Sequence, residues 1–511
     1  MSSFTIARNA IFNLSSFLVT ALVTFLLVPV MLKYLGPVGF GIWAVVRVLI
    51  NYASLGDLGL TNAITKFVAE KKIESDRKEI LSLLMSALLL YIIIVGALWL
   101  IFLLLKEILI QTFFANANGF SEDLDIVLFG SLSVLSINLL FSITTSTFNG
   151  MQRMDITNAV MSLFWILNGL LMYFALSAGY GLKGLVYANI IATVIAQSIN
   201  LIIFFKIVGF RISKLLPVHF SQVGKLFRYG KHIFIGAVAN GVHIHYDKLL
   251  LSSFLGLVPV SSYEIASRVV QQMRQIPILI FNPLLPAVSE MQTRNDSEGI
   301  KKYYLNASKY LIVSLIPLFG FIGFFAKPLL EIWLGEGNDL AIVTLQIFII
   351  SNFLNLLTAP GYFVTLGIGR PQYSMYISII GLASNLILSY VFLRIFGYFG
   401  VVTGTVTALV GSSMIFLVLI HKCLRINWLN YLEYFIKPVS CFIVSCLTGF
   451  AILLLIQNLY IKTLLAIILC VIVYLFLIWK MNYFTEDDRA FFSQFVKKLR
   501  EKILPSTSIE A

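Results

Sequence analysis

Apolar runs of about twenty residues follow one another along almost the whole chain, separated by short charged or Gly-Pro segments. A bilayer core about 30 Å thick needs roughly 20 apolar residues per crossing helix, so each run predicts one transmembrane helix. The pattern therefore predicts an all-α polytopic membrane protein. Its fourteen expected helices lie near residues 10–32, 40–65, 80–105, 124–148, 157–178, 184–205, 232–256, 262–288, 308–326, 340–363, 373–393, 400–420, 438–456 and 463–480.

The distribution of Lys and Arg predicts the orientation of these helices. If the N-terminus is cytoplasmic, the inside segments hold most of the 37 basic residues, including the basic loop 206–231 and the tail 481–511. The outside segments then hold Lys33, Lys106, Lys183, Lys327, Arg394 and Lys462. Positive residues accumulate on the cytoplasmic side, so we expect both termini in the cytoplasm. The net charge of +13 needs no nucleic-acid partner, because anionic lipid headgroups account for it.

The two halves of the chain resemble each other. Leu35-Gly36 and Val68-Ala69-Glu70 return 220 residues later as Leu255-Gly256 and Val288-Ser289-Glu290. A second set returns after 217 or 216 residues: Gly150, Arg153, Asn168, Gly181 and Gly184 match Gly367, Arg370, Asn385, Gly397 and Gly400. The repeat unit holds six predicted helices, so both copies start on the same side of the membrane, as in transporters with parallel repeats.

This repeat predicts the organisation of the chain. We expect two pseudo-symmetric six-helix bundles around a central cavity, followed by two additional helices. The predicted segments are an N-terminal lobe 1–205, a basic cytoplasmic loop 206–231, a C-terminal lobe 232–420, two further transmembrane helices in 421–480, and an amphipathic cytoplasmic tail 481–511.

Several charged and polar residues fall inside the predicted helices. A charge in a membrane helix costs about 2.5–3.5 kcal/mol on insertion scales, so it normally faces a partner or a water-filled cavity. The candidates for substrate binding in the cavity are Arg47, Asn51, Lys248, Arg268, Gln271 and Arg274, and those for ion coupling are Asp57, Asp247 and Glu264. Glu264 and Arg268 are also spaced as an ordinary helical ion pair. Asp247 and Lys248 are adjacent and point apart, so each needs its own partner.

The chain lacks the sequence signals of several enzyme classes. No Gly-rich phosphate loop opens a helix, no His or Cys cluster has metal-ligand spacing, and no cofactor is expected. One acidic pair, Asp123 and Asp125, fits a membrane-bound glycosyltransferase. The same residues also suit the first turn of a helix, where acidic side chains complement the helix dipole. We therefore expect no catalytic residue and no enzymatic activity.

Two groups of motifs carry a family resemblance. The first is Leu35-Gly36-Pro37 through Gly39-Phe40-Gly41-Ile42-Trp43, with Leu55-Gly56-Asp57-Leu58-Gly59-Leu60 after it. The second is Asp247-Lys248-Leu249-Leu250, Leu255-Gly256, Tyr263, Ala266-Ser267-Arg268 and Leu285 to Glu290. Over most of its length the chain resembles the Wzx-type polysaccharide and O-antigen flippases of the multidrug/oligosaccharidyl-lipid/polysaccharide exporter superfamily.

This resemblance implies a function. It implies alternating access of a central cavity and a polyprenyl-diphosphate-linked oligosaccharide as cargo, flipped across a bacterial inner membrane beside membrane lipids. It also suggests a polysaccharide polymerase and glycosyltransferases as partners. A lipid II flippase, a drug/cation antiporter of the same superfamily and a membrane-bound glycosyltransferase remain alternatives. The sugar repeat, the lipid length, the coupling ion (H⁺ or Na⁺) and the oligomeric state do not follow from the sequence.

Overall fold

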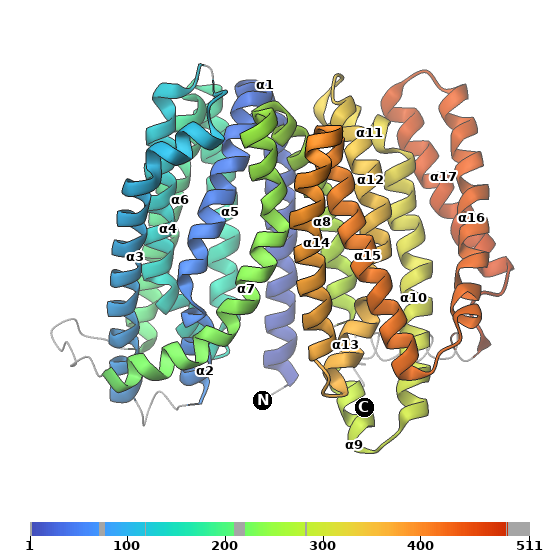
Figure 1. Ribbon diagram of the computed structural model, residues 1–511, viewed down its shortest axis with the longest axis horizontal. Coiled ribbons are helices and arrows are strands. Elements are labelled where there is room, and N and C mark those ends of the chain that lie inside the picture. The colour runs from blue at the N-terminus through green and yellow to red at the C-terminus, as the bar shows by residue number, and fades with distance from the viewer. Residues whose placement is uncertain are drawn as a thin grey trace, which may run out of the picture. The chain divides into compact units, whose positions relative to one another are not determined.

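The computed structural model describes residues 3–70, 77–117, 119–208, 220–281, 284–486 and 488, and within these residues it is helical without strands (Figure 1). The helices are α1 (Ser3–Ser54), η1 (Leu55–Asp57), α2 (Leu60–Ala69), α3 (Arg77–Phe113), α4 (Ser121–Gly150), α5 (Met154–Ser177), α6 (Gly181–Val208), α7 (Phe220–Leu255), α8 (Leu257–Phe281), α9 (Leu284–Thr293), α10 (Ser297–Phe324), α11 (Ala326–Leu334), α12 (Asp339–Leu356), α13 (Ala359–Gly367), α14 (Gln372–Phe396), α15 (Tyr398–Leu424), α16 (Trp428–Leu455) and α17 (Leu459–Lys480). The predicted all-α class is confirmed.

Within the described residues, eleven helices are long and apolar enough to cross a membrane. The expected number of fourteen is not confirmed. The predicted span 10–32 and most of the predicted span 40–65 lie in α1, on either side of a kink at Gly36, whose backbone angles of φ 66° and ψ 179° are not helical. The predicted spans 232–256 and 262–288 correspond to α7 and α8. These two helices carry more polar and charged residues than the eleven candidate membrane spans do.

Large apolar side chains cover the outer surface of many helices. Leu104, Leu455 and Ile472 have exposed fractions of 71%, 81% and 58%. A soluble protein rarely exposes contiguous apolar surface on this scale, whereas a bilayer solvates it well. The chain is a multi-pass membrane protein.

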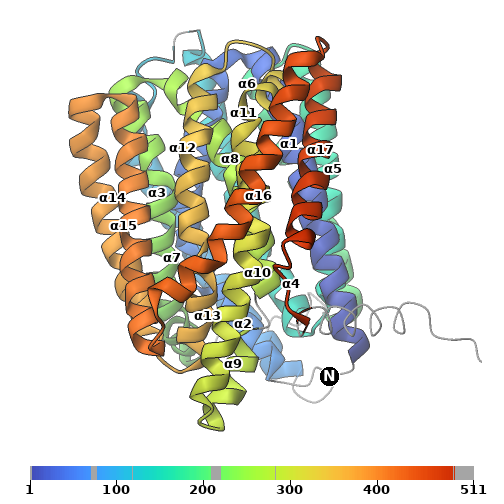
Figure 2. The ribbon, with the colours of Figure 1, turned by 90° about the vertical axis from the view of Figure 1, so that its right-hand side faces the viewer.

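The first of two compact units contains residues 1–272, 337–347 and 375–412. Its N-terminal half packs α2, α3, α4 and α6 around a core in which Leu60, Ile64, Tyr91 and Phe148 are fully buried. The rest of the first unit includes most of α14 and part of α15, and these two helices lie side by side in both views (Figures 1 and 2). A Cβ on Gly404 of α15 would lie 2.6 Å from the Ser389 backbone of α14, so this contact depends on glycine.

The second unit contains residues 273–336, 348–374 and 413–511, of which the residues after 488 lie outside the described part. Its core joins α9, α10, α13 and the last two helices. The Tyr474 hydroxyl of α17 donates to the Val313 carbonyl of α10 at 2.8 Å. Helices α16 and α17 thus bury one face against the unit and leave an apolar face exposed, as expected for a pair at the lipid boundary.

These units do not follow the predicted boundaries, so the division into lobes 1–205 and 232–420 stays a prediction. The predicted loop 206–231 lies partly outside the described residues, and the amphipathic tail 481–511 lies almost entirely outside them.

The internal repeat is visible as two equivalent contacts, one in each unit. A Cβ on Gly150 would lie 2.8 Å from both the Thr65 carbonyl oxygen and the Val68 Cβ. A Cβ on Gly367 would lie 2.7 Å from the Val288 Cβ and 3.3 Å from the Leu285 carbonyl oxygen. Each partner of Gly150 thus returns 220 residues later as a partner of Gly367.

The backbone at the repeated glycines also matches. Gly36 and Gly256 have φ values of 66° and 88°, and Gly181 and Gly397 have 55° and 59°. All four occupy the left-handed region, which favours glycine. The two halves therefore share local geometry as well as sequence.

Candidate functional site

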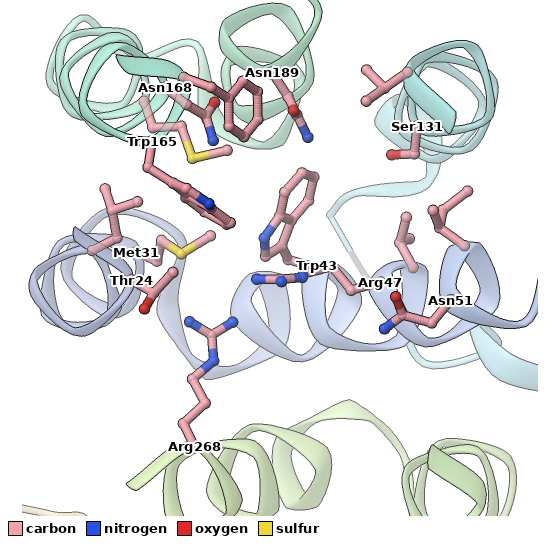
Figure 3. A pocket seen from close by; sticks show the side chains of 16 residues that line it. Thr24, Met31, Trp43, Arg47, Asn51, Ser131, Trp165, Asn168, Asn189 and Arg268 are labelled. Carbon is pink, nitrogen blue, oxygen red and sulfur yellow. The ribbon is translucent and has the colours of Figure 1, made fainter. Parts of the chain in front are cut away.

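A polar cavity of about 190 Å³ lies in the first unit, lined by residues of α1, α4, α5, α6 and α8 (Figure 3). Its apolar walls include Leu27, Met31, Val134 and Met172. The polar and aromatic residues that line it are Thr24, Trp43, Arg47, Asn51, Ser131, Trp165, Asn168, Asn189 and Arg268. We refer to this space as the polar cavity.

The two halves of α1 contribute different walls of this cavity. Thr24 and Met31 come from the half before Gly36, and Trp43 and Arg47 come from the half after it (Figure 3). The turn at Gly36 therefore allows one sequence element to supply two walls. On α5, the close approach of Gly169 to Val23 of α1 brings Trp165 and Asn168 to the same space, because a Cβ at Gly169 would lie 2.6 Å from a Val23 methyl.

Helix α8 reaches the cavity through a second close contact. A Cβ on Gly41 of α1 would overlap the Leu257 carbonyl oxygen at the start of α8. The Arg268 guanidinium lies 5.5 Å from the centre of the Phe40 ring, a cation–π distance. These contacts direct Arg268 toward the cavity, where Figure 3 shows its guanidinium on the same side as that of Arg47.

Lys248, Glu264 and Arg268 form a buried charge cluster. The Glu264 carboxylate accepts a 2.6 Å hydrogen bond from Arg268 Nε through one oxygen and pairs with Lys248 Nζ through the other. The exposed fractions of the three side chains are 6% for Lys248, 9% for Glu264 and 14% for Arg268. The predicted helical pair therefore exists, with Lys248 as its third member. A buried carboxylate that has two cationic partners avoids most of the cost of an isolated charge.

Arg47 differs from this cluster. Its side chain is exposed to the cavity, and the described residues give it neither a hydrogen bond nor an ion pair. Lys248 and Glu264 cancel each other's charge, so Arg47 and Arg268 leave two positive charges at the cavity. Guanidinium groups bind phosphate oxygens through paired hydrogen bonds. The cavity is therefore suited to a ligand with two negative charges.

Asp247 lies in a separate cluster of neutral polar groups. It accepts hydrogen bonds from the Tyr263 hydroxyl at 2.5 Å and from the Thr405 hydroxyl at 2.6 Å, and the Asn385 amide approaches it at 3.5 Å. Asp247 and Lys248 thus have different partners, as their adjacency predicted. The Oδ1 atom of Asn385 is buried and accepts no hydrogen bond within the described residues. Four helices, α7, α8, α14 and α15, contribute to this oxygen-rich cluster.

The other candidate residues lie elsewhere. Asp57 accepts hydrogen bonds from the Thr61 and Tyr91 hydroxyls, both at 2.6 Å. Asn51 lines the polar cavity and approaches His245 at 3.4 Å. Gln271 is exposed on α8 and is absent from the cavity lining. Arg274 belongs to the second unit, where its guanidinium donates to the Asn352 amide oxygen at 2.7 Å.

The acidic pair near residue 123 has structural partners. Asp123 pairs with Lys183 at 2.8 Å and Asp125 pairs with Lys106 at 2.7 Å. Both lysines come from neighbouring helices, so the pairs tie the start of α4 to α6 and α3. Among the described residues, no group of three or more His, Cys, Asp or Glu side chains could hold a metal ion.

Several residues of these sites were not among the predicted candidates. Trp43, Trp165, Asn168 and Asn189 line the polar cavity, and Asn385 and Thr405 contact Asp247. The repeat contained a signal for two of them, because Asn168 and Asn385 are equivalent positions. The tryptophans have no such signal, since a lone indole in an apolar run is equally suited to lipid or to a core.

Comparison with known families agrees with this architecture. The model of the family described as polysaccharide biosynthesis protein matches residues 6–292, more than half of the chain, and the MatE family model matches residues 246–391. The chain therefore belongs to the polysaccharide biosynthesis protein family, and the predicted resemblance is confirmed.

Two relatives match over most of their length. A Shigella flexneri protein named as an O-antigen transporter is 22% identical over 410 residues, which cover 77% of this chain and 93% of that protein. A Haloferax volcanii protein named as a low-salt glycan biosynthesis flippase is 22% identical over 73% of this chain and 74% of its own. These names describe transport, so the chain is assigned to transport proteins and not to enzymes.

Two solved structures share the fold. The lipid II flippase MurJ in an inward closed conformation aligns with a TM-score of 0.73 and 17% identity over 93% of this chain and 98% of its own. An inward-facing multidrug resistance transporter of the MATE family aligns with a TM-score of 0.66 and 15% identity, covering 82% of this chain and 98% of its own. The fold is that of these polytopic helical transporters.

Proposed function

We propose that this protein is a flippase for a polyprenyl-diphosphate-linked oligosaccharide, such as an O-antigen or capsule repeat unit. It moves the headgroup from the cytoplasmic to the outer leaflet of a bacterial inner membrane while the lipid tail stays in the bilayer. Both termini are cytoplasmic, and a polymerase and glycosyltransferases of the same pathway are its partners. Family membership and the names of the relatives support this cargo class.

The observation that carries the proposal is the pair of guanidinium groups in the polar cavity. A sugar-linked lipid diphosphate has two negative charges and cannot enter hydrocarbon without partners. Arg47 and Arg268 provide two positive charges inside the membrane-spanning unit, and the charge of Lys248 is already neutralised by Glu264. A drug/cation antiporter would need the opposite sign of charge at this position.

The proposal includes coupling to a cation at Asp247. The carboxylate, the unpartnered Asn385 Oδ1 and the Thr405 hydroxyl offer the oxygen ligands that hard cations prefer. Glu264 is less suitable, because Lys248 and Arg268 already occupy both of its oxygens. Either Na⁺ or a proton would reduce the cost of burying Asp247, and gradient experiments distinguish them.

The test replaces Arg268 with alanine. Because Glu264 keeps Lys248 as a partner, R268A removes one positive charge from the cavity without leaving a buried carboxylate alone. We expect R268A to insert normally and to abolish surface polysaccharide in a host that lacks its own copy. R294A is the matched control, since Arg294 forms an exposed pair with Glu290. Normal surface polysaccharide with R268A would refute the assignment.

Two alternatives make different predictions. A glycosyltransferase would require both acidic residues near 123, so D123N/D125N would abolish glycan synthesis and not only transport. A lipid II flippase shares the fold, and cargo assays with each lipid-linked glycan in proteoliposomes distinguish the two.

A further inference from the structure

The turn after α4 and the turn after α13 are equivalent parts of the two repeats. Each contains one arginine, Arg153 or Arg370, whose backbone N–H donates to the carbonyl oxygen five residues earlier at 2.8 Å. The residue before each arginine, Gln152 or Gly369, has a left-handed backbone with φ 60° or 72°. The two turns therefore hold the two arginines in the same backbone geometry.

The two arginines differ in their charged partners. The Arg153 Nε donates to both Asp155 oxygens, at 3.1 and 3.3 Å, and Asp155 also pairs with Arg8 at 3.4 Å. In the second repeat Gln372 stands 217 positions after Asp155, where it replaces the aspartate. Arg370 is exposed and forms no ion pair with a described residue. Its guanidinium lies 3.4 Å from the Tyr373 hydroxyl and 3.8 Å from the Cys423 sulfur.

Two more basic residues lie close to Arg370. Its contact with Cys423 places the turn beside the end of α15, where the Cα atoms of Lys422 and Arg425 lie no more than about 8 Å from that of Cys423. Both side chains are exposed, and neither forms an ion pair with a described residue. We call Arg370, Lys422 and Arg425 the basic triplet. Like charges repel one another, so this surface is complementary to an anion.

The basic triplet lies at the ends of candidate membrane spans. Arg370 precedes α14, and the other two members lie at the end of α15. The exposed Trp428 begins α16, the next span, beside the same end of α15. Tryptophan at the end of a span is typical of the level of the lipid headgroups. On α14 the exposed Tyr376 follows within two turns, so apolar surface suited to lipid starts close to the triplet.

We propose that the basic triplet is a binding site for the headgroup of an anionic phospholipid. The Arg370 guanidinium matches two phosphate oxygens, and Lys422 and Arg425 attract a headgroup with a net negative charge more strongly than a zwitterionic one. The lipid connects the turn before α14 to the end of α15 through one shared anion. The equivalent turn of the first repeat lacks such a site, because Asp155 already pairs with Arg153. The proposal is independent of the cargo.

The experiment titrates the detergent-solubilised full chain with phosphatidylglycerol and measures the affinity for the first bound lipid by native mass spectrometry. Each Lys or Arg near an anionic surface strengthens the attraction about fivefold, so we expect R370Q to weaken binding about fivefold and R370Q/K422Q/R425Q about fiftyfold or more. Phosphatidylcholine contains the same phosphate without a net charge. We expect it to bind the wild type more weakly than phosphatidylglycerol does.

The first repeat offers a matched control. R153Q changes the net charge by the same amount in the equivalent turn, but Arg153 already has a carboxylate partner, so the affinity for phosphatidylglycerol should not change. Q372D supplies the carboxylate that the first repeat has, and it should weaken binding as much as R370Q while Arg370 is still present. Arg370 and Gln372 are exposed, so both variants should unfold at the wild-type temperature.

Three results would overturn the proposal. R370Q could bind phosphatidylglycerol as tightly as the wild type, or R153Q could lose as much affinity as R370Q, which would reduce the effect to net charge. The third result is weaker binding of geranyl diphosphate by R370Q with unchanged binding of phosphatidylglycerol. It would assign the basic triplet to a lipid diphosphate and not to a phospholipid of the bilayer.

Discussion

Asn168 and Asn385 are equivalent residues of the two repeats, 217 positions apart, and in each the buried Oδ1 atom accepts no hydrogen bond from the described residues. Asn168 faces the polar cavity, whereas Asn385 lies beside the Asp247 carboxylate. One repeated position thus supplies an unused acceptor to two chemically different sites. We propose a cation for the second acceptor.

The first prediction concerns Glu264. E264Q leaves Lys248 buried without a carboxylate, and removing one member of a buried ion pair costs about 3–5 kcal/mol. We expect a lower thermal unfolding temperature for purified E264Q, with K248M/E264Q recovering most of the loss. The double variant keeps Arg47 and Arg268, so its flipping rate should stay close to that of the wild type. A double variant that is stable but inactive would show that Lys248 or Glu264 acts directly on the cargo.

The second prediction concerns Asp247. D247N keeps the size of the side chain and removes the charge that would attract a cation. In proteoliposomes, we expect its flipping rate to become independent of an imposed Na⁺ gradient or pH gradient, whichever drives the wild type. D57N is the control, because Asp57 also accepts hydrogen bonds from one Thr and one Tyr hydroxyl. Loss of gradient dependence in D57N alone would move the coupling site to Asp57.

The third prediction concerns the contact between α1 and α8. An alanine at Gly41 would overlap the Leu257 carbonyl oxygen, and overpacking of this kind costs about 1–3 kcal/mol. We expect G41A to be less stable and to flip more slowly, since α8 must shift and take Arg268 with it. G96A is the matched control, because a Cβ at Gly96 of α3 would meet no atom within 4 Å. Equal unfolding temperatures for the two variants would contradict this account.

The fourth prediction concerns the ion pair between Lys309 and Asp488, at 2.5 Å. Burial raises the pKa of Asp488, but hydrogen bonds from Lys309, Tyr310 and Thr485 outweigh it and lower the pKa to about 2. K309M leaves a buried carboxylate without its cation and should cost about 3–5 kcal/mol. We expect K309M to unfold at a lower temperature than the wild type, and K309M/D488N to recover most of this loss because it removes the unpaired carboxylate.

The ion pair between Lys309 and Asp488 also predicts that the stability of the folded protein depends on pH. The pKa of Asp488 is lower in the folded protein than its ordinary value of 3.8, so the pair stabilises the fold above pH 3.8. This contribution is lost as the pH falls through about 2. The difference in unfolding temperature between wild type and K309M should therefore stay constant from about pH 5 to about pH 8 and shrink below pH 3.8. A constant difference down to pH 2 would mean that Asp488 is not the partner.

Much of the architecture was predictable because the bilayer imposes one length and one polarity on every crossing helix. The ranges of α4, α5, α6 and α15 agree with the predicted spans to within a few residues. The exceptions have local causes. Gly36 separates the two predicted helices as expected, but they follow each other without a loop, so both lie within α1 on either side of its kink. Helices α7 and α8 carry charges that lower the apolar signal of a span.

The candidate site was predicted only in part. Periodicity places Glu264 and Arg268 on one face of α8, and the structure confirms their contact at 2.6 Å. Periodicity cannot show that Lys248, on another helix, shares the Glu264 carboxylate, or that Arg274 donates to Asn352. Such pairings depend on which helices meet, and a linear sequence does not contain that information.

The matching contacts of Gly150 with Val68 and of Gly367 with Val288 have an evolutionary consequence. They indicate that the chain contains two copies of one ancestral segment. The crowded glycine contacts are alike in both copies, whereas the equivalent Asn168 and Asn385 have chemically different surroundings. New cargo preferences could then arise through mutation of a few cavity residues, without any change to the inherited scaffold.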